Sequence, residues 1–300
     1  MWFIFALTTF FAWGAADLFY KKGNENDEKY THLKTSIVVG LVMGATAIVT
    51  ILTKGIDYNP KNLLIYLPVS FMYILSMTIG YFGLRYLELS ISSPIQNASG
   101  AVSCILLILV LHKLPDTLSL IAVALITLGV VLLGVFEKDK NRKKEKGIIA
   151  FFFPIIYCII DSLGTFFDGY YLDDINTTPL VNVTEDNFED VANISYQFTF
   201  LIVAILLIIF LKIKREPLKP SAQKNRLFAA VFETAGQLTY VYALSGKAVI
   251  AAPVIASYCV GSVVLARIFL KEKLPAKEYI SVFLVFLGII LLGIIEGISG

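Results

Sequence analysis

The chain has 300 residues, of which 57% are hydrophobic and only 16% are charged, and its mean hydropathy is +0.76. Average soluble domains carry about 25% charged residues, so this composition excludes an ordinary soluble domain and predicts an integral membrane protein. The formal net charge of +2 is uninformative as a total, and only the placement of the charges along the chain carries information.

Apolar runs along the chain reach the roughly 20 residues that a helix needs to cross the hydrocarbon of a bilayer. The first run lacks the positive flank of a signal peptide and continues past Trp13 to Tyr20, so we expect it to be retained. The hydropathy pattern predicts an all-α membrane protein with ten transmembrane helices. The expected spans are residues 2–20, 33–53, 63–84, 91–111, 117–136, 148–168, 193–211, 227–246, 249–270 and 278–297.

One stretch of the sequence occurs twice, at residues 94–137 and 253–296. Each copy contains Lys-Leu-Pro, and the final helices read ITLGVVLLGVFE and VFLGIILLGIIE. Such self-similarity indicates duplication. Because each copy belongs to a set of five spans, an odd number, the second set must enter the membrane upside down. We therefore expect two inverted five-helix repeats, residues 1–137 and 148–300, joined by a basic linker at 138–147.

The basic residues predict the orientation. All but four of the 25 lysine and arginine residues fall on one side of the predicted membrane, and such a bias marks the cytoplasmic side. We therefore expect a multi-pass protein of the cell membrane with cytoplasmic basic loops and both termini outside. The four exceptions are Lys54, Lys61, Lys113 and Lys247.

The predicted outer loop at residues 172–192 has six acidic residues and no basic one. It could attract cations, but we expect a solvated, weakly ordered loop. Glycosylation sequons begin at Asn176, Asn182 and Asn193.

No residue pattern indicates a cofactor or a metal. Cys104, Cys158 and Cys259 each lie in an apolar run without a CxxC pair or a histidine cluster, which favours packed thiols. The sequence has no phosphate-binding GxxxxGK[ST] loop, which excludes ATP as the energy source, and we expect no nucleic-acid partner.

The sequence resembles a known family over essentially its whole length, most strongly from Pro253 to Gly293. Trp13-Gly14 in the first span, Pro253 leading the ninth span, the FLKEKL turn at 269–274 and Gly288 in the last helix resemble the EamA-type transporters of the drug/metabolite transporter superfamily. The resemblance implies a secondary transporter of small metabolites, often an exporter, with a central cavity shared by both halves. The first half departs from the pattern because His112 stands where the family usually has glutamate.

The sixth span provides the most informative candidate residues. Tyr157, Asp161, Thr165 and Asp168 recur at helical spacing and share one helix face. An ionisable group inside a bilayer is costly and is a functional hypothesis by default. Asp161 should lie well inside the membrane, where it lines the transport path or else packs against a neighbouring helix. Asp168 is interpreted as an exposed helix end near the outer surface.

Other spans offer further candidates. In the eighth span Glu233, Gln237 and Tyr240 share a face, and Glu233 either lines a cavity or pairs within the bundle. In the first span Trp13 and Asp17 could bind an amine through cation–π attraction and charge pairing, although Asp17 could also pair with Lys21. Uncharged polar stripes in the third and fourth spans contain Tyr73 and Gln96.

Together these residues predict a secondary active transporter, not an enzyme, that exports a small polar metabolite by alternating access. Carboxylates in a low-dielectric cavity could bind an amine-like cargo, such as an amino acid, and could exchange protons for it. The expected partners are the small-molecule substrate, the lipid bilayer and protons. The alternative is an integral membrane enzyme or lipid-carrier protein, which would want an interfacial cluster of His, Asp or Arg, whereas the chain offers scattered single residues.

Overall fold

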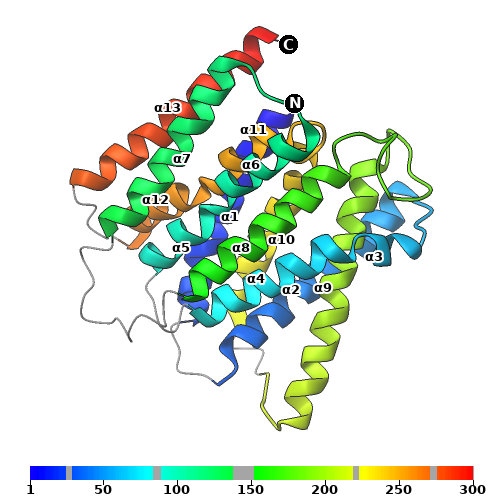
Figure 1. Cartoon of the computed structure of the whole chain (residues 1–300). Coiled ribbons are helices and arrows are strands. Elements are labelled where there is room, and N and C mark those ends of the chain that lie inside the picture. The colour runs from blue at the N-terminus through cyan, green and yellow to red at the C-terminus, as the bar shows by residue number, and fades with distance from the viewer. Residues whose placement is uncertain (25–28, 84–88, 138–151, 219–222, 271–275, 300) are drawn as a thin grey trace.

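The computed structural model describes residues 1–24, 29–83, 89–137, 152–218, 223–270 and 276–299, and the basic linker expected at 138–147 lies outside them. In these residues all the regular structure is helical (Figure 1), which confirms the all-α prediction. The helices are α1 Trp2–Asn24, α2 Thr31–Lys54, α3 Lys61–Ile65, α4 Leu67–Gly83, α5 Leu89–Asn97, α6 Ser99–Leu111, α7 Thr117–Glu137, α8 Phe152–Tyr171, α9 Phe188–Ile213, α10 Lys224–Leu244, α11 Ala248–Ala256, α12 Tyr258–Leu270 and α13 Ala276–Ser299.

The described part of the chain contains seven helical segments that are long and apolar enough to cross a membrane. Two shorter apolar helices, Leu67–Gly83 and Ile95–Leu111, add to these. Large apolar side chains such as Leu52, Leu206 and Phe283 are exposed on the outside of the bundle, where hydrocarbon rather than water would be a favourable neighbour. The chain is therefore a multi-pass membrane protein.

Three of the expected spans are each divided into two consecutive helices. The breaks fall at Tyr66, Ala98 and Ser257. The last two follow a proline by four residues, at Pro94 and Pro253, and a proline removes one backbone hydrogen bond from the helix. The backbone stays hydrogen-bonded at the breaks: the Tyr66 N–H donates to the Asn62 carbonyl, the Val102 N–H to the Ala98 carbonyl and the Ser257 N–H to the Pro253 carbonyl.

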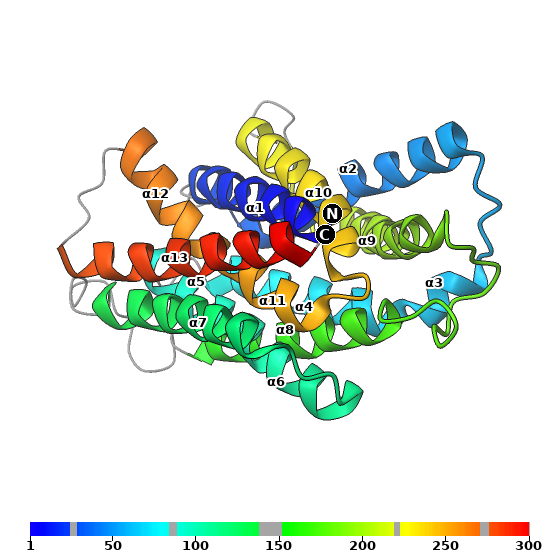
Figure 2. The ribbon, with the colours of Figure 1, turned by 90° about the horizontal axis from the view of Figure 1, so that it is seen from above.

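The helices pack as pairs around the centre of the bundle. Helix α1 packs against α10, α4 against α8, α2 against α9 and α7 against α13. The α7–α13 pair forms one edge of the bundle, α2 and α9 lie toward the opposite edge, and α1, α4, α8 and α10 lie between them (Figures 1 and 2). This arrangement places the helices that carry the predicted site residues at the centre.

Two glycines allow α2 to approach α9 closely. A Cβ atom on Gly40 would lie 2.3 Å from the backbone oxygen of Phe200, and one on Gly44 would lie 2.7 Å from the side chain of Leu201. Real Cβ atoms essentially never approach within 3.0 Å of such atoms. Glycines four residues apart are a common device for close helix contact in membranes, and here they set the distance between α2 and α9.

The acidic loop between α8 and α9 is exposed over much of its length, as expected of a solvated loop, but a few of its residues anchor it to the bundle. Leu172 and Leu180 are buried. The side-chain amide of Asn62 donates to the Val181 carbonyl at 2.9 Å, and the Val181 N–H donates to Asn62 Oδ1 at 2.8 Å. Of the three sequons, Asn176 and Asn182 are exposed, whereas Asn193 is buried and donates to the Leu238 carbonyl at 3.2 Å.

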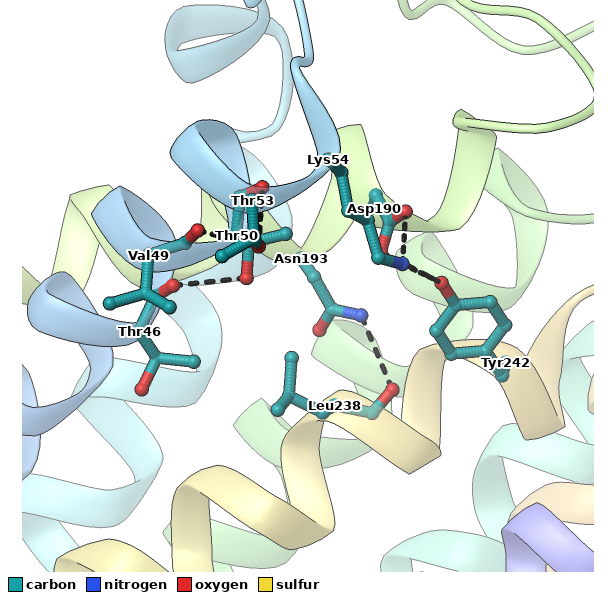
Figure 3. Close-up of polar contacts among 9 residues, drawn as sticks. All are labelled: Thr46, Val49, Thr50, Thr53, Lys54, Asp190, Asn193, Leu238 and Tyr242. Carbon is teal, nitrogen blue, oxygen red and sulfur yellow. Dashed lines mark hydrogen bonds and ion pairs between the residues drawn. The ribbon is translucent and has the colours of Figure 1, made fainter.

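An ionic contact ties three helices together next to this loop (Figure 3). At the end of α2, Lys54 Nζ lies 2.6 Å from Asp190 Oδ2 at the start of α9, and the Tyr242 hydroxyl of α10 donates to Asp190 Oδ1 at 2.7 Å. Asp190 is buried while Lys54 is half exposed. The carboxylate therefore holds a cation and a phenol that come from two other helices.

We expect Asp190→Ala to destabilise the protein by about 1–3 kcal/mol, because it removes the acceptor of two hydrogen bonds at a buried position. Unfolding of the purified protein in denaturant measures the change. The matched control is Asp186→Ala, an exposed acid of the loop just before α9, which should unfold within about 0.5 kcal/mol of the parent. Equal stability of the two variants would contradict a clamping role for Asp190.

Candidate functional site

A cavity lies at the centre of the bundle, between α1, α4, α8 and α10 and beside the breaks that separate α5 from α6 and α11 from α12. Its volume is about 80 Å³, several times the roughly 10–15 Å³ that one enclosed water requires. The cavity can therefore hold a cluster of waters or a small solute. The nine residues predicted to bind substrate all line it: Trp13, Asp17, Tyr73, Gln96, Tyr157, Asp161, Glu233, Gln237 and Tyr240.

Asp161 on α8 is held by serines from the other half of the chain. Ser99 of α6 donates to its Oδ2 at 2.7 Å, and Ser76 of α4 donates to its Oδ1 at 3.4 Å. The Asp161 side chain lines the cavity, and so does Tyr157, which lies one turn earlier on α8. The structure thus combines both roles weighed for Asp161, because the carboxylate lines the cavity and also bonds to neighbouring helices.

Asp17 on α1 is held in the same manner. Ser262 of α12 donates to its Oδ2 at 2.8 Å and Ser93 of α5 at 3.4 Å. Trp13 stands one turn before Asp17, as Tyr157 stands one turn before Asp161. Each carboxylate therefore has an aromatic ring on the same helix face and a serine partner across the bundle.

Glu233 on α10 is the third carboxylate of the cavity and is largely buried. The Tyr20 hydroxyl donates to its Oε2 at 3.4 Å, and the Trp13 indole donates to its backbone carbonyl at 3.2 Å. A Cβ atom on Gly236 would lie 2.3 Å from the indole ring. Trp13 can therefore reach the cavity wall because position 236 has no side chain.

Aromatic rings and amides form the rest of the wall. The rings of Trp13 and Tyr240 lie 5.1 Å apart, and Tyr73 hydrogen-bonds to Tyr240 and, at 2.9 Å, to Thr165. Gln96 Nε2 donates to Ser92 at 3.0 Å. Gln237 is buried, and its Nε2 has no hydrogen-bond partner within the described residues, so it offers a donor to a bound solute.

The charge of the cavity wall has one sign. Three carboxylic acids line it, and no lysine, arginine or histidine is among its described lining residues. In the part of the chain that the structure describes, these acids do not form a group that could hold a metal ion. The acids are spread around the wall, so the cavity favours a cationic or hydrogen-bond-donating solute over an anion.

Asp168 corrects one prediction from the sequence. It was expected at an exposed helix end, but it is 0% exposed, it accepts a hydrogen bond from the Tyr66 hydroxyl, and it does not line the cavity. Tyr66, at the break between α3 and α4, covers it, and Leu172, the residue after α8, is itself buried. One face of the final turn of α8, at Asp168 and Gly169, therefore lies inside the protein, while Tyr170 on the other face is exposed.

Some lining residues were not selected from the sequence. Tyr20 and Tyr81 share the helical faces that the spacing predicts for Asp17 and Tyr73, although they are not among the nine substrate-binding candidates. Asn97 and Tyr258 flank two helix breaks, and Tyr196 comes from α9. These three belong to no polar stripe that sequence periodicity detects.

A bundle of apolar helices around a central cavity with acidic, amide and aromatic side chains in its wall is typical of one class of protein, the membrane proteins that handle small solutes within the bilayer. Comparison of the sequence with protein families assigns the chain to one family within this class. The model of the EamA-like transporter family matches residues 1–135 and 177–294, so the chain belongs to that family.

One solved structure, described only as "Crystal structure of protein", is similar with a TM-score of 0.71 at 12% identity, covering 98% of this chain and 96% of the other. That likeness shows the fold. No curated protein matches the sequence significantly.

Proposed function

We propose that the protein is a secondary active transporter that exports a small amine-bearing metabolite, such as an amino acid or a diamine, through the central cavity. The main support for this proposal is that three carboxylic acids and several aromatic rings line the cavity, whereas none of its described lining residues is basic. An ammonium group forms strong charge-assisted hydrogen bonds with carboxylates and is attracted to the faces of Trp and Tyr rings. Proton exchange, rather than ATP, is the proposed energy source.

The proposed alternating access requires two related halves, and the helix packing supports them. We match α1, α2, α4, α6 and α7 with α8, α9, α10, α12 and α13. If each helix is replaced by its match in the other half, every contact should become another observed contact. The α1–α10 contact becomes α8–α4, the α2–α10 contact becomes α9–α4, and the α1–α12 contact becomes α8–α6. All of these helix pairs pack in the structure. Ser262 of α12, which donates to Asp17, and Ser99 of α6, which donates to Asp161, also lie on matched helices.

The α7–α13 pair supports an axis in the membrane plane. A Cβ on Gly129 would meet Val285 at 2.6 Å, and a Cβ on Gly288 would meet Ile126 at 2.7 Å. In the duplicated sequence Gly129 corresponds to Gly288 and Ile126 to Val285, so each contact is the image of the other, as a two-fold axis requires. The two helices run in opposite directions (Figure 1), so this axis is perpendicular to them.

We propose ten spans in two inverted repeats, residues 1–137 and 148–300. Seven long apolar segments and two shorter apolar helices account for nine of these spans. The tenth span is α10, which exposes Leu227, Phe228 and Val231 on its outer face. Its inner face carries Glu233 and Gln237, which lowers its mean hydropathy. The family match falls into two parts, one in each proposed repeat.

The proposed orientation places both termini outside the cell and the basic loops in the cytoplasm. Trp2 Nε1 donates to Glu296 at 2.6 Å, so the two ends of the chain lie together. Lys54 and Lys113, two of the four lysines expected outside, pair with Asp190 and Asp173 of the acidic loop. The first contact supports a common side for the two termini, and the other two support a common side for these lysines and the loop.

A ligand screen on the purified protein tests the function. We expect 1,4-diaminobutane and leucine to raise the unfolding temperature, and glucose and glucose 6-phosphate to leave it unchanged, because a ligand stabilises the state that binds it by RT ln(1 + [L]/Kd). A ligand at about 100 times its Kd stabilises by about 2.7 kcal/mol. Stabilisation by the sugar phosphate alone would contradict a cavity built for amines.

A further inference from the structure

Asp168 is a buried acid that the cavity does not use. Its side chain is 0% exposed, and it lies three residues after Thr165, which does line the cavity. The hydroxyl of Tyr66, itself fully buried, donates to Oδ1. Oδ2 is buried without a hydrogen-bond partner in the part of the chain that the structure describes.

The groups around Asp168 do not compensate a negative charge. The titratable groups that face it are the phenols of Tyr66, Tyr73, Tyr196 and Tyr240, from the α3–α4 break, α4, α9 and α10. On the α6 and α11 side, Leu107 and Ala248 pack at the neighbouring Gly169.

Asp161 is two turns away on the same helix. Lys113, a cation expected on the outer side, pairs with Asp173 at 2.7 Å. No ion pair to Asp168 exists among the described residues. Burying an ionised carboxylate without a cation costs far more than burying the neutral acid. The closed arrangement therefore favours the protonated form of Asp168.

Asp168 lies between the cavity and the outer end of α8, so a proton bound to it could be released in either direction. Toward the cavity stand the hydroxyls of Thr165, Tyr73 and Tyr240, which are hydrogen-bonded to one another. Toward the outer end of α8 stand Tyr171, whose ring packs at 5.9 Å against that of Tyr66, and buried Leu172. An outward opening that separates Tyr66 from α8 would bring water to the carboxyl.

We propose that Asp168 binds the proton that the carrier exchanges for its cargo, at a site separate from Asp17, Asp161 and Glu233. A proton from external water forms the O–H bond at Oδ2, the neutral acid permits the outer end to close, and water that reaches the opened cavity accepts the proton on the other side. This inference rests on the proposed transport function. It assigns coupling to one acid and cargo binding to the other three.

Proteoliposomes containing the Asp168→Asn variant test the proposal with 1,4-diaminobutane as the probe. Asparagine keeps the shape and the oxygen that accepts from Tyr66 but binds no proton. We expect accumulation driven by an imposed pH gradient to fall at least tenfold, while exchange of labelled for unlabelled probe without a gradient stays within about twofold of the parent. The control Asp186→Asn should keep both activities.

Two results would overturn the proposal. The first is gradient-driven accumulation that survives in Asp168→Asn. The second is loss of exchange together with accumulation, because Asp168 would then serve cargo binding or the fold. A separate readout does not depend on the cargo: the infrared spectrum of the purified parent minus that of Asp168→Asn should contain the carbonyl band of a protonated carboxyl at neutral pH.

Absence of that infrared band also overturns the proton site. If the band is present but the parent transports none of the amine probes, the proton site stands and the proposed cargo fails instead.

Discussion

Asp161→Asn is expected to weaken binding of 1,4-diaminobutane at least tenfold. A hydrogen bond to a charged group contributes about 1.5–3 kcal/mol, and about 1.4 kcal/mol corresponds to a factor of ten. Asparagine has nearly the same shape as aspartate and keeps an oxygen for Ser99 or Ser76, which donate to Asp161 in the parent. The change therefore removes charge with little disturbance of packing, and titration calorimetry on the purified variant measures the loss.

Matched variants locate this effect in the cavity. Glu233→Gln is expected to weaken binding in the same direction, since Glu233 lines the same wall. Asp186→Asn makes the same chemical change on the exposed outer loop and should bind like the parent. Parental affinity in both cavity variants would leave Asp161 and Glu233 as packing residues and remove the case for an amine cargo.

Gly40→Leu is expected to destabilise the folded bundle by about 3 kcal/mol or more, at the upper end of the usual cost of overpacking. The new Cβ would lie 2.3 Å from the backbone oxygen of Phe200 and 2.7 Å from the Ala204 side chain. A backbone oxygen within a helix cannot turn aside as a side chain can, so α2 and α9 must separate. Unfolding in mixed micelles, followed by circular dichroism, measures the change.

The control for that experiment lies on the same helix. Ala45 is exposed on the lipid-facing side of α2, and Ala45→Leu adds similar bulk where no helix packs. We expect its stability to remain within about 0.5 kcal/mol of the parent. Equal destabilisation by both substitutions would indicate a general effect of leucine in α2 rather than a close contact at Gly40.

Sequence periodicity predicted much of the candidate site. Trp13 and Asp17 on one helix, and Tyr157 and Asp161 on another, are spaced so that each pair shares a helix face. Because a carboxylate avoids lipid, the face that carries it turns toward the interior of the bundle. The structure places all nine selected residues around one cavity, while binding of a solute there remains a prediction.

Contacts between distant segments could not be predicted in this way. The burial of Asp168 depends on Tyr66, which lies 102 residues earlier in the chain. The packing of the acidic loop depends on Asn62, which lies 119 residues from its partner Val181. Hydropathy gives the length of a span, but it does not say which residue from another helix covers the end of that span.

The central claim is that two halves of the chain open a shared cavity alternately to each side of the membrane. Counterflow tests it most directly: proteoliposomes loaded with unlabelled 1,4-diaminobutane are diluted into a trace of labelled compound. An alternating-access carrier predicts a transient accumulation of label above its external concentration, lost in an Asp161→Asn and Glu233→Gln double variant. Label that only equilibrates in the parent, or never enters, would contradict the account.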